Sequence, residues 1–177
     1  NEPQHRWGGE KDSVQEGCHY DAENLAAFYN VFYRYLDSFN KRYAKNIKLS
    51  VLESGNYDTY KPAAILEYVY AMSKYDYFDK IDSLAVHSYG EPLSDEARNS
   101  FIYKLGAKWE DKFSIEMSEV CHMESGQDKS MGSGLYLAQM MDKDMRLLSA
   151  TSWSWWIGAS GYNYNDGLVG WEFGSER

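Results

Sequence analysis

Segments with helical periodicity alternate with strand-like segments along this sequence, and this alternation constrains the fold more than any other feature. After a loop rich in Gly, His and Gln over residues 1–20, apolar side chains recur every three or four residues in 21–43, which predicts a long helix with Asp21 as N-cap. Strands are expected at 47–52, 81–87, 113–117 and 151–156, and further helices at about 60–78, 94–109 and 133–148.

This order of elements predicts parallel strands joined by crossover helices. Two architectures fit it, an open doubly wound sheet and part of a (β/α)8 barrel. No G-x-G-x-x-G follows any strand, so a dinucleotide-binding sheet loses its best support. A complete barrel takes roughly 250 residues. The fold class expected is therefore α/β, the C-terminal half of a (β/α)8 TIM barrel from the end of strand four to strand eight.

The composition narrows the class of function. The formal net charge is −9, with 27 acidic against 18 basic residues, which argues against a protein that must neutralise nucleic-acid phosphates. No apolar run approaches the length of a membrane span. The 16 Tyr and 6 Trp beside few basic residues suit a surface that stacks sugar rings, although most of the Tyr are expected in the core.

The cysteines and histidines show no metal-ligand spacing. There are two cysteines, Cys18 and Cys121, and four histidines, none of them in a pattern such as HExxH. No metal site is therefore predicted. A Cys18–Cys121 disulfide and two free thiols both remain open.

Residues with chemical functions follow the predicted strands. Glu2, Glu53 and Glu119 stand at strand ends, and so do the pairs His87 with Tyr89 and Trp153 with Trp155. In a barrel these ends converge on one face, which carries the active site. Glycosidic cleavage requires such a set, because one protonated carboxyl group protonates the leaving oxygen and a second, ionised one attacks the anomeric carbon. Tryptophan faces stack on the sugar.

Four segments occur in the order known from one enzyme family. They are NEPQHRWGGEKDSVQEGC (1–18), AVHSYG (85–90), IEMSEVC (115–121) and SWSWWIGASGYNYNDGLV (152–169). Together they resemble glycoside hydrolase family 30 of clan A, and within it the endo-β-1,6-galactanase-like members. The resemblance implies that Glu2 is the general acid/base and Glu119 the nucleophile of a retaining enzyme, with carboxyl groups about 5 Å apart. It implies no cofactor and no metal.

The resemblance also implies residues that bind substrate. Asn1 would hold the sugar 2-OH, Trp7 and Glu16 would border the cleft, and His87 and Tyr89 would line the centre, with Tyr89 bonded to the nucleophile. Trp153 or Trp155 would be the stacking platform. Strand alternation puts these two on one face, which we expect to point to the barrel axis, with Trp156 under the helices. Glu53 and Glu16 are equally well explained as solvated side chains, and Glu116 as structural.

The family pattern further implies that this chain lacks the N-terminal half of the barrel and a side β-domain. Residues 1–160 would form the partial catalytic barrel, and 161–177 the exit towards that domain. Such a half alone is expected to be poorly folded and inactive, because its sheet edges and apolar face lack partners.

The function expected is endo-acting, retaining hydrolysis of a β-linked polysaccharide or oligosaccharide. The expected substrate is a β-1,6-galactan. Another family 30 specificity, for β-1,6-glucan, xylan or a glucosylceramide-like β-glucoside, is the alternative. A non-catalytic carbohydrate-binding relative is a second alternative, although it would be expected to have lost Glu2 or Glu119. The resemblance places the protein outside the cell, in the periplasm or at the cell surface.

Overall fold

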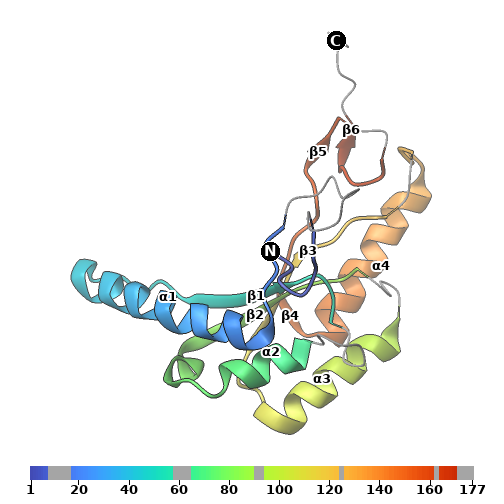
Figure 1. Ribbon diagram of the computed structural model, residues 1–177. Coiled ribbons are helices and arrows are strands. Elements are labelled where there is room, and N and C mark those ends of the chain that lie inside the picture. Colours follow the sequence, from blue (N-terminus) through green and yellow to red (C-terminus); the bar gives the residue numbers. More distant parts are fainter. Residues whose placement is uncertain (8–16, 58–64, 90–93, 124–125, 162–163, 171–177) are drawn as a thin grey trace.

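A parallel sheet flanked by helices organises the chain. The computed structural model describes residues 1–7, 17–57, 65–89, 94–123, 126–161 and 164–170 (Figure 1). The elements are α1 (Ala22–Tyr43), β1 (Leu49–Ser54), α2 (Ile65–Met72), the 3-10 helix η1 (Asp76–Lys80), β2 (Ile81–His87), α3 (Asp95–Trp109), β3 (Ser114–Glu119), α4 (Met131–Leu147), β4 (Ala150–Trp153), β5 (Ala159–Ser160) and β6 (Val169–Gly170). In this part of the chain no helix combines the length and the apolarity that crossing a bilayer requires.

The four main strands follow one another in the order β1-β2-β3-β4, and each neighbouring pair is parallel. Each connection is therefore a crossover, with helical segments between the strands. The predicted alternation of strands and helices is confirmed, and the chain is α/β. The short β5 and β6, which the sequence did not predict, form a separate two-stranded parallel sheet.

The helix starts are fixed by local side-chain caps. Asp21 accepts a hydrogen bond from the backbone N–H of Asn24 at 2.8 Å, which confirms it as the N-cap of α1. Ser94 caps α3 in the same way, and Ser130 caps α4. These caps satisfy N–H groups that have no partner within the helix.

The prediction of one helix over 60–78 was wrong in its extent. Helix α2 ends at Met72, and bonds with i+3 spacing carry the chain through a tight turn into η1. This turn lets the side chain of Tyr77 enter the core, where its hydroxyl donates to the carbonyl of Ala26 at 3.1 Å. A continuous helix would have directed that side chain elsewhere. Residues 58–64 lie outside the described part of the chain.

The two faces of the sheet differ in chemistry. The face under the helices buries apolar side chains, among them Leu84, Val86 and Met117, which have no exposed surface. On the other face Ser50 of β1 donates to the carboxylate of Glu116 on β3 at 2.9 Å, and therefore reaches past β2. The apolar core lies between the sheet and the helices. The polar side chains lie on the opposite face of the sheet and at the strand ends.

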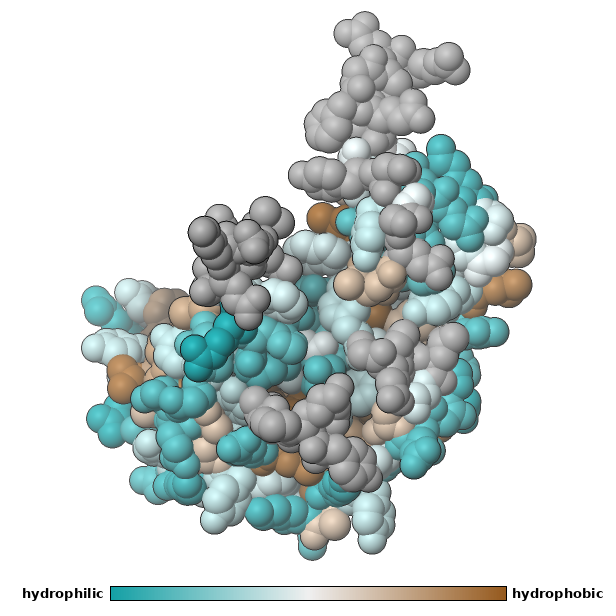
Figure 2. Space-filling model, turned by 45° about the vertical axis from the view of Figure 1, so that its right-hand side comes forward, coloured by the Kyte–Doolittle hydropathy of each residue, from teal (hydrophilic) through white to brown (hydrophobic). Residues whose placement is uncertain are grey.

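Helix α1 projects beyond the sheet (Figure 1). It keeps a broad apolar face uncovered. Only Leu25 and Ala26 of this helix are buried. Exposed apolar side chains of α1 are Phe28, Val31, Phe32, Tyr35, Phe39 and Tyr43. Hydrophobic patches interrupt the hydrophilic surface in the space-filling view (Figure 2). A contiguous apolar face of this kind is usually covered by a partner surface.

Candidate active site

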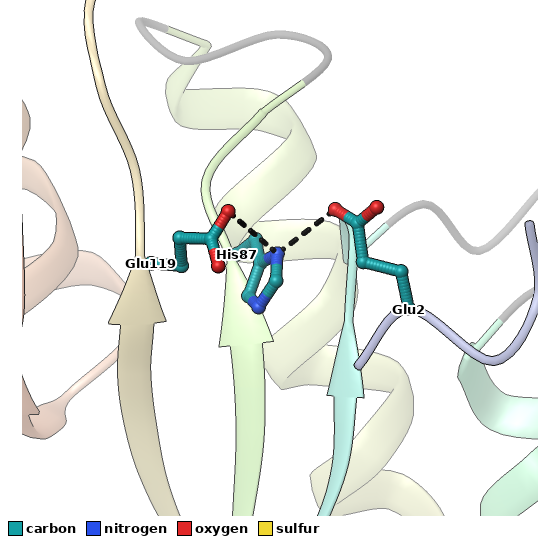
Figure 3. Close-up of side chains that lie close together, drawn as sticks. All are labelled: Glu2, His87 and Glu119. Atoms are coloured by element: carbon teal, nitrogen blue, oxygen red, sulfur yellow. Dashed lines mark hydrogen bonds and ion pairs between the residues drawn. The ribbon is translucent and has the colours of Figure 1, made fainter. Parts of the chain in front are cut away.

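Three carboxylates and one histidine come together where the strands end. Glu53 is at the end of β1. His87 ends β2 and Glu119 ends β3, while Glu2 comes from the N-terminal loop (Figure 3). The backbone N–H of Glu2 donates to the carbonyl of Glu53 at 2.7 Å, which fixes the loop against β1. The sequence predicted that side chains at the strand ends lie close together, and Glu2, His87 and Glu119 do so.

The backbone at this point adopts conformations that L-residues rarely take. Glu2 has φ 44°, Leu52 has φ 89° and Glu53 has φ 51°. Such left-handed residues cost free energy, about 1–3 kcal/mol each, and persist where the surroundings require them. Space is also restricted, because a Cβ at Gly55 would lie 2.8 Å from both Glu2 Oε1 and His5 Nε2. The loop that carries Glu2 is thus tightly positioned.

His87 is the centre of this cluster and has no exposed surface. Its Nδ1 lies 3.0 Å from Glu2 Oε1 and 3.9 Å from Glu119 Oε1. Its Nε2 lies 3.2 Å from Glu53 Oε2, which also accepts a bond from the Ser118 hydroxyl at 2.7 Å. Figure 3 shows the imidazole between the carboxylates of Glu2 and Glu119.

The surrounding carboxylates keep His87 protonated. Burial alone would lower its pKa, but the hydrogen bonds with Glu2 and Glu53 and the negative charge of Glu119 raise the pKa to about 9. At neutral pH the ring is an imidazolium with a proton on each nitrogen. Glu2, His87 and Glu119 each offer an atom within 4.8 Å of the others. A metal ion at this cluster would have to displace a ring proton that three carboxylates stabilise.

Glu2 and Glu119 have pKa values shifted in opposite directions. For Glu2, burial acts to raise the pKa, but hydrogen bonds from His87 and from the Trp7 indole outweigh it and hold the pKa below its ordinary value. For Glu119, burial is the largest effect, and with the charges of Glu2 and Glu53 it raises the pKa against the opposing influence of His87 and Tyr89. In the absence of substrate Glu2 is therefore the more readily ionised of the two.

Tyr89 directs its hydroxyl at Glu119. The O–H donates to Glu119 Oε1 at 3.2 Å, as the sequence predicted, and lies 3.8 Å from the sulfur of Cys121. The ring of Tyr89 stands edge-on to the imidazole of His87, with centroids 5.8 Å apart. Burial raises the pKa of Tyr89, so the phenol stays neutral and remains a donor.

The remaining residues of the N-terminal loop differ in their involvement. The Trp7 indole donates to Glu2 Oε2, and its ring lies 5.0 Å from that of His5. Trp7 is 36% exposed, so part of the ring faces solvent. Asn1 is exposed. Glu16, expected to border the cleft, lies outside the described residues.

The orientation expected for the strand-eight tryptophans requires correction. Trp153 and Trp155 do share a face, with stacked rings 5.9 Å apart, but Trp153 pairs with Met117, which belongs to the core under the helices. The indole N–H of Trp153 donates to buried Asp144 of α4 at 2.9 Å. Trp156, expected under the helices, is instead 49% exposed. The expectation that this pair faces the barrel axis was therefore wrong, and β4 ends at Trp153, so strand alternation does not extend to Trp156.

A second buried charge cluster lies behind the site and was not predicted. Asp144 of α4 pairs with Arg98 of α3 at 2.7 Å, and neither has exposed surface. Asp144 also accepts from the Ser88 hydroxyl at 2.8 Å, next to His87, and from Trp153. One signal existed in the sequence, because Arg98 stands three residues before Phe101 on the buried stripe of α3.

The two cysteines are free thiols in this structure, so the disulfide that the sequence left open is not formed. Cys18 is exposed, whereas Cys121 is buried beside the Tyr89 hydroxyl and the sulfur of Met123. Burial raises the pKa of the Cys121 thiol, which makes it a poor nucleophile.

Comparison with known proteins gives a family and a fold. The family described as O-glycosyl hydrolase family 30 matches residues 53–170. No curated protein matches the chain. Among solved structures, the crystal structure of a conserved exported protein from Bacteroides fragilis is similar, with a TM-score of 0.64 and 19% identity. The similarity covers 92% of this chain and 37% of that one, so the chain spans little more than a third of the similar protein.

Proposed function

This chain belongs to O-glycosyl hydrolase family 30, and on that premise we propose that it supplies both catalytic carboxylates of a retaining glycosidase. The observation that carries the proposal is the approach of Glu2 and Glu119, which offer carboxylate oxygens within 4.8 Å of each other. Retaining enzymes hold the two carboxyl groups about 5 Å apart, whereas inverting enzymes leave roughly 6.5–9.5 Å for a water molecule.

The surroundings of the two residues support separate roles in a double displacement. Glu119 attacks the anomeric carbon and forms an ester, while Tyr89 holds one of its oxygens. Glu2 protonates the departing oxygen as the glycosidic C–O bond breaks. Glu2 then takes a proton from water, which attacks the same carbon and releases Glu119. Trp7 holds the second oxygen of Glu2 in place.

We further propose that residues 1–160 form the second half of a (β/α)8 barrel and 161–177 the exit towards a side β-domain. The unbroken strand order β1 to β4 supports this architecture, as does the uncovered aromatic face of α1 next to the edge strand β1. The preceding half of a barrel would cover both. The similarity to just over a third of a longer chain agrees with this reading.

The substrate we propose is a β-linked polysaccharide, with β-1,6-galactan first and β-1,6-glucan, xylan or a glucosylceramide-like β-glucoside as alternatives. Trp156, half exposed beyond the end of β4, offers an aromatic face for a sugar in place of Trp153. A non-catalytic carbohydrate-binding role is less well supported, because both carboxylates are present and converge. Export is proposed as well, since the similar Bacteroides fragilis protein is described as exported.

Two variants of the full-length protein test this function. Glu119→Ala should abolish turnover of every glycoside, because no ester can form. Glu2→Ala should still cleave an aryl glycoside with a nitrophenolate leaving group, which needs little protonation, but should lose polysaccharide hydrolysis. Added azide should then release a β-glycosyl azide from Glu2→Ala and an α-glycosyl azide from Glu119→Ala.

The wild-type protein is first screened on β-1,6-galactan, β-1,6-glucan and xylan, with release of reducing ends as the measurement. Reversed azide stereochemistry would exchange the two roles. Near-normal polysaccharide hydrolysis by both variants would place the active site elsewhere and contradict the proposal.

A further inference from the structure

Two carboxylates contact opposite nitrogens of the His87 imidazole, and this geometry determines how many protons the three side chains share. Glu2 lies 3.0 Å from Nδ1 of His87, and Glu53 lies 3.2 Å from Nε2. An ionised carboxylate only accepts, whereas a neutral imidazole donates from one nitrogen alone. The row Glu2–His87–Glu53 therefore holds two protons. Both are on the ring, or one is on the ring and the other on a carboxyl group.

The surroundings decide which of the two protons can move. Glu53 Oε2 already accepts from the Ser118 hydroxyl at 2.7 Å, and this bond holds the carboxylate in place. The proton between His87 Nε2 and Glu53 therefore stays on the ring nitrogen. The other proton lies between Nδ1 and Glu2 Oε1, at the end of the row that faces Glu119. Trp7 occupies the second oxygen of Glu2. The mobile proton is therefore the one that His87 shares with Glu2.

We propose that His87 stores on Nδ1 the proton that Glu2 delivers to the departing sugar oxygen, and that Glu53 is the positioning residue that keeps the ring oriented and charged. This inference rests on the proposed function and deepens it. It also explains how Glu2 can be the acid although its pKa is held low without substrate, since the proton of the pair then resides on the neighbouring ring.

The proposed steps balance in protons and charge. The proton moves from Nδ1 to Glu2, which leaves a neutral imidazole with its Nε2–H on Glu53. Glu2 passes the proton to the leaving oxygen as Glu119 forms the ester bond. Water then attacks the anomeric carbon and gives a proton to Glu2, Glu119 leaves as a carboxylate, and the proton returns to Nδ1. The summed charge of the four side chains is the same before, between and after the steps.

The charges that face His87 favour a stored proton. Glu2 reaches it from the N-terminal loop, Glu53 from β1 and Glu119 from β3, while Tyr89 faces it with a neutral ring edge. Three carboxylates around one buried ring stabilise its cationic form and raise its pKa to about 9. Below that pH His87 carries the proton on Nδ1. As the pH rises through that value, the proton is lost and the first chemical step should fail.

The test is the pH dependence of kcat/KM on an aryl β-glycoside with a poor leaving group, measured with the full-length protein. Glu53→Gln keeps an acceptor for Nε2–H but removes the charge. The pKa at which kcat/KM declines at high pH, the alkaline limb, should therefore fall by about one unit. At a fixed pH above that pKa, this is a tenfold loss of kcat/KM. The matched control is Asp82→Asn, an exposed carboxylate on the same strand as His87, which should leave the limb unmoved.

His87→Gln gives the stronger comparison. It should lose at least about tenfold in kcat/KM at neutral pH on the poor leaving group, yet retain cleavage of a dinitrophenyl glycoside, which needs no proton. If this variant does not fold, 15N NMR of the histidines decides. The wild-type His87 ring should be doubly protonated up to about pH 9 and should titrate at lower pH in Glu53→Gln.

An alkaline limb and a ring titration that both stay unchanged in Glu53→Gln would overturn the proton store. A wild-type alkaline limb in a folded His87→Gln would overturn it as well. These results leave the proposed function standing if Glu2→Ala and azide still give the β-product. Failure of the wild-type protein on every glycoside would instead remove the proposed function first.

Discussion

Two buried charge clusters, only one residue apart in the sequence at His87 and Ser88, are built on different principles. Arg98 and Asp144 form an ion pair between α3 and α4, and Asp144 accepts further bonds from Ser88 and Trp153. The cluster around His87 instead sets three carboxylates against one cation. A buried ion pair whose carboxylate also accepts several hydrogen bonds holds elements together. An unbalanced cluster keeps pKa values displaced, which is what acid–base chemistry requires.

The largest expected effect is a difference in unfolding free energy between a variant of the Arg98–Asp144 pair and a variant of the His87 cluster. Asp144→Asn should lower the free energy of unfolding by about 3–5 kcal/mol, because it removes the carboxylate that pairs with the buried Arg98 charge and accepts from Ser88 and Trp153. Glu119→Gln should not lower it, and at neutral pH should raise it, because folding raises the pKa of Glu119 and so disfavours its charged form. Urea unfolding of both variants measures the difference.

A double variant, Arg98→Met with Asp144→Leu, serves as the control for that comparison. It should recover part of the loss, since both buried charges are removed together, but not all of it, because the Ser88 hydroxyl and Trp153 indole lose their acceptor. Equal losses in Asp144→Asn and Glu119→Gln would mean that the two clusters do not differ as described.

The second expected effect is on activity rather than stability. Tyr89→Phe removes the O–H that donates to Glu119 Oε1. A hydrogen bond to a charged group contributes about 1.5–3 kcal/mol, so kcat/KM should fall by roughly ten- to hundredfold. The apolar ring remains, so the unfolding midpoint should change little. An activity equal to wild type would show that this contact does not position the nucleophile.

The smallest effect is a pH dependence of stability that comes from His87. Its pKa is raised in the fold to about 9, so its contribution is fully present below the ordinary value of 6.5 and is lost as the pH rises through 9. The difference in unfolding free energy between wild type and His87→Gln should therefore shrink between pH 7 and pH 10. Asp144→Asn should show no such trend relative to wild type. If the unfolding free energies of all three proteins changed with pH in parallel, the raised pKa would not belong to His87.

The sequence predicted the elements well because their periodicity is local. The strand 81–87 and the cap Asp21 were recovered from spacing and residue type alone. The meeting of Glu2, His87 and Glu119 followed from strand order, since the carboxyl ends of parallel strands lie at one edge.

Other features could not be predicted, because they depend on non-local geometry. Strand β4 ends at Trp153, so the alternation assumed over 151–156 does not reach Trp156, and the neighbour that Trp153 takes on β3 is Met117 of the core. The bond from the His87 ring to Glu53 accompanies left-handed backbone at Leu52 and Glu53, and neither is a glycine that would have signalled it. The ion pair of Arg98 joins two helices whose contact no local pattern encodes.

The strand order β1-β2-β3-β4 also has a consequence for how the chain reaches this state. Each of β2, β3 and β4 pairs with the strand made just before it, and the paired residues are separated by roughly 30 residues of chain, which keeps the loop to be closed shorter than pairing with a more distant strand would. At a synthesis rate of about 5–20 residues per second, a new β–α unit leaves the ribosome every few seconds. The sheet can therefore grow one strand at a time during translation, and β4 is the last of the four to dock.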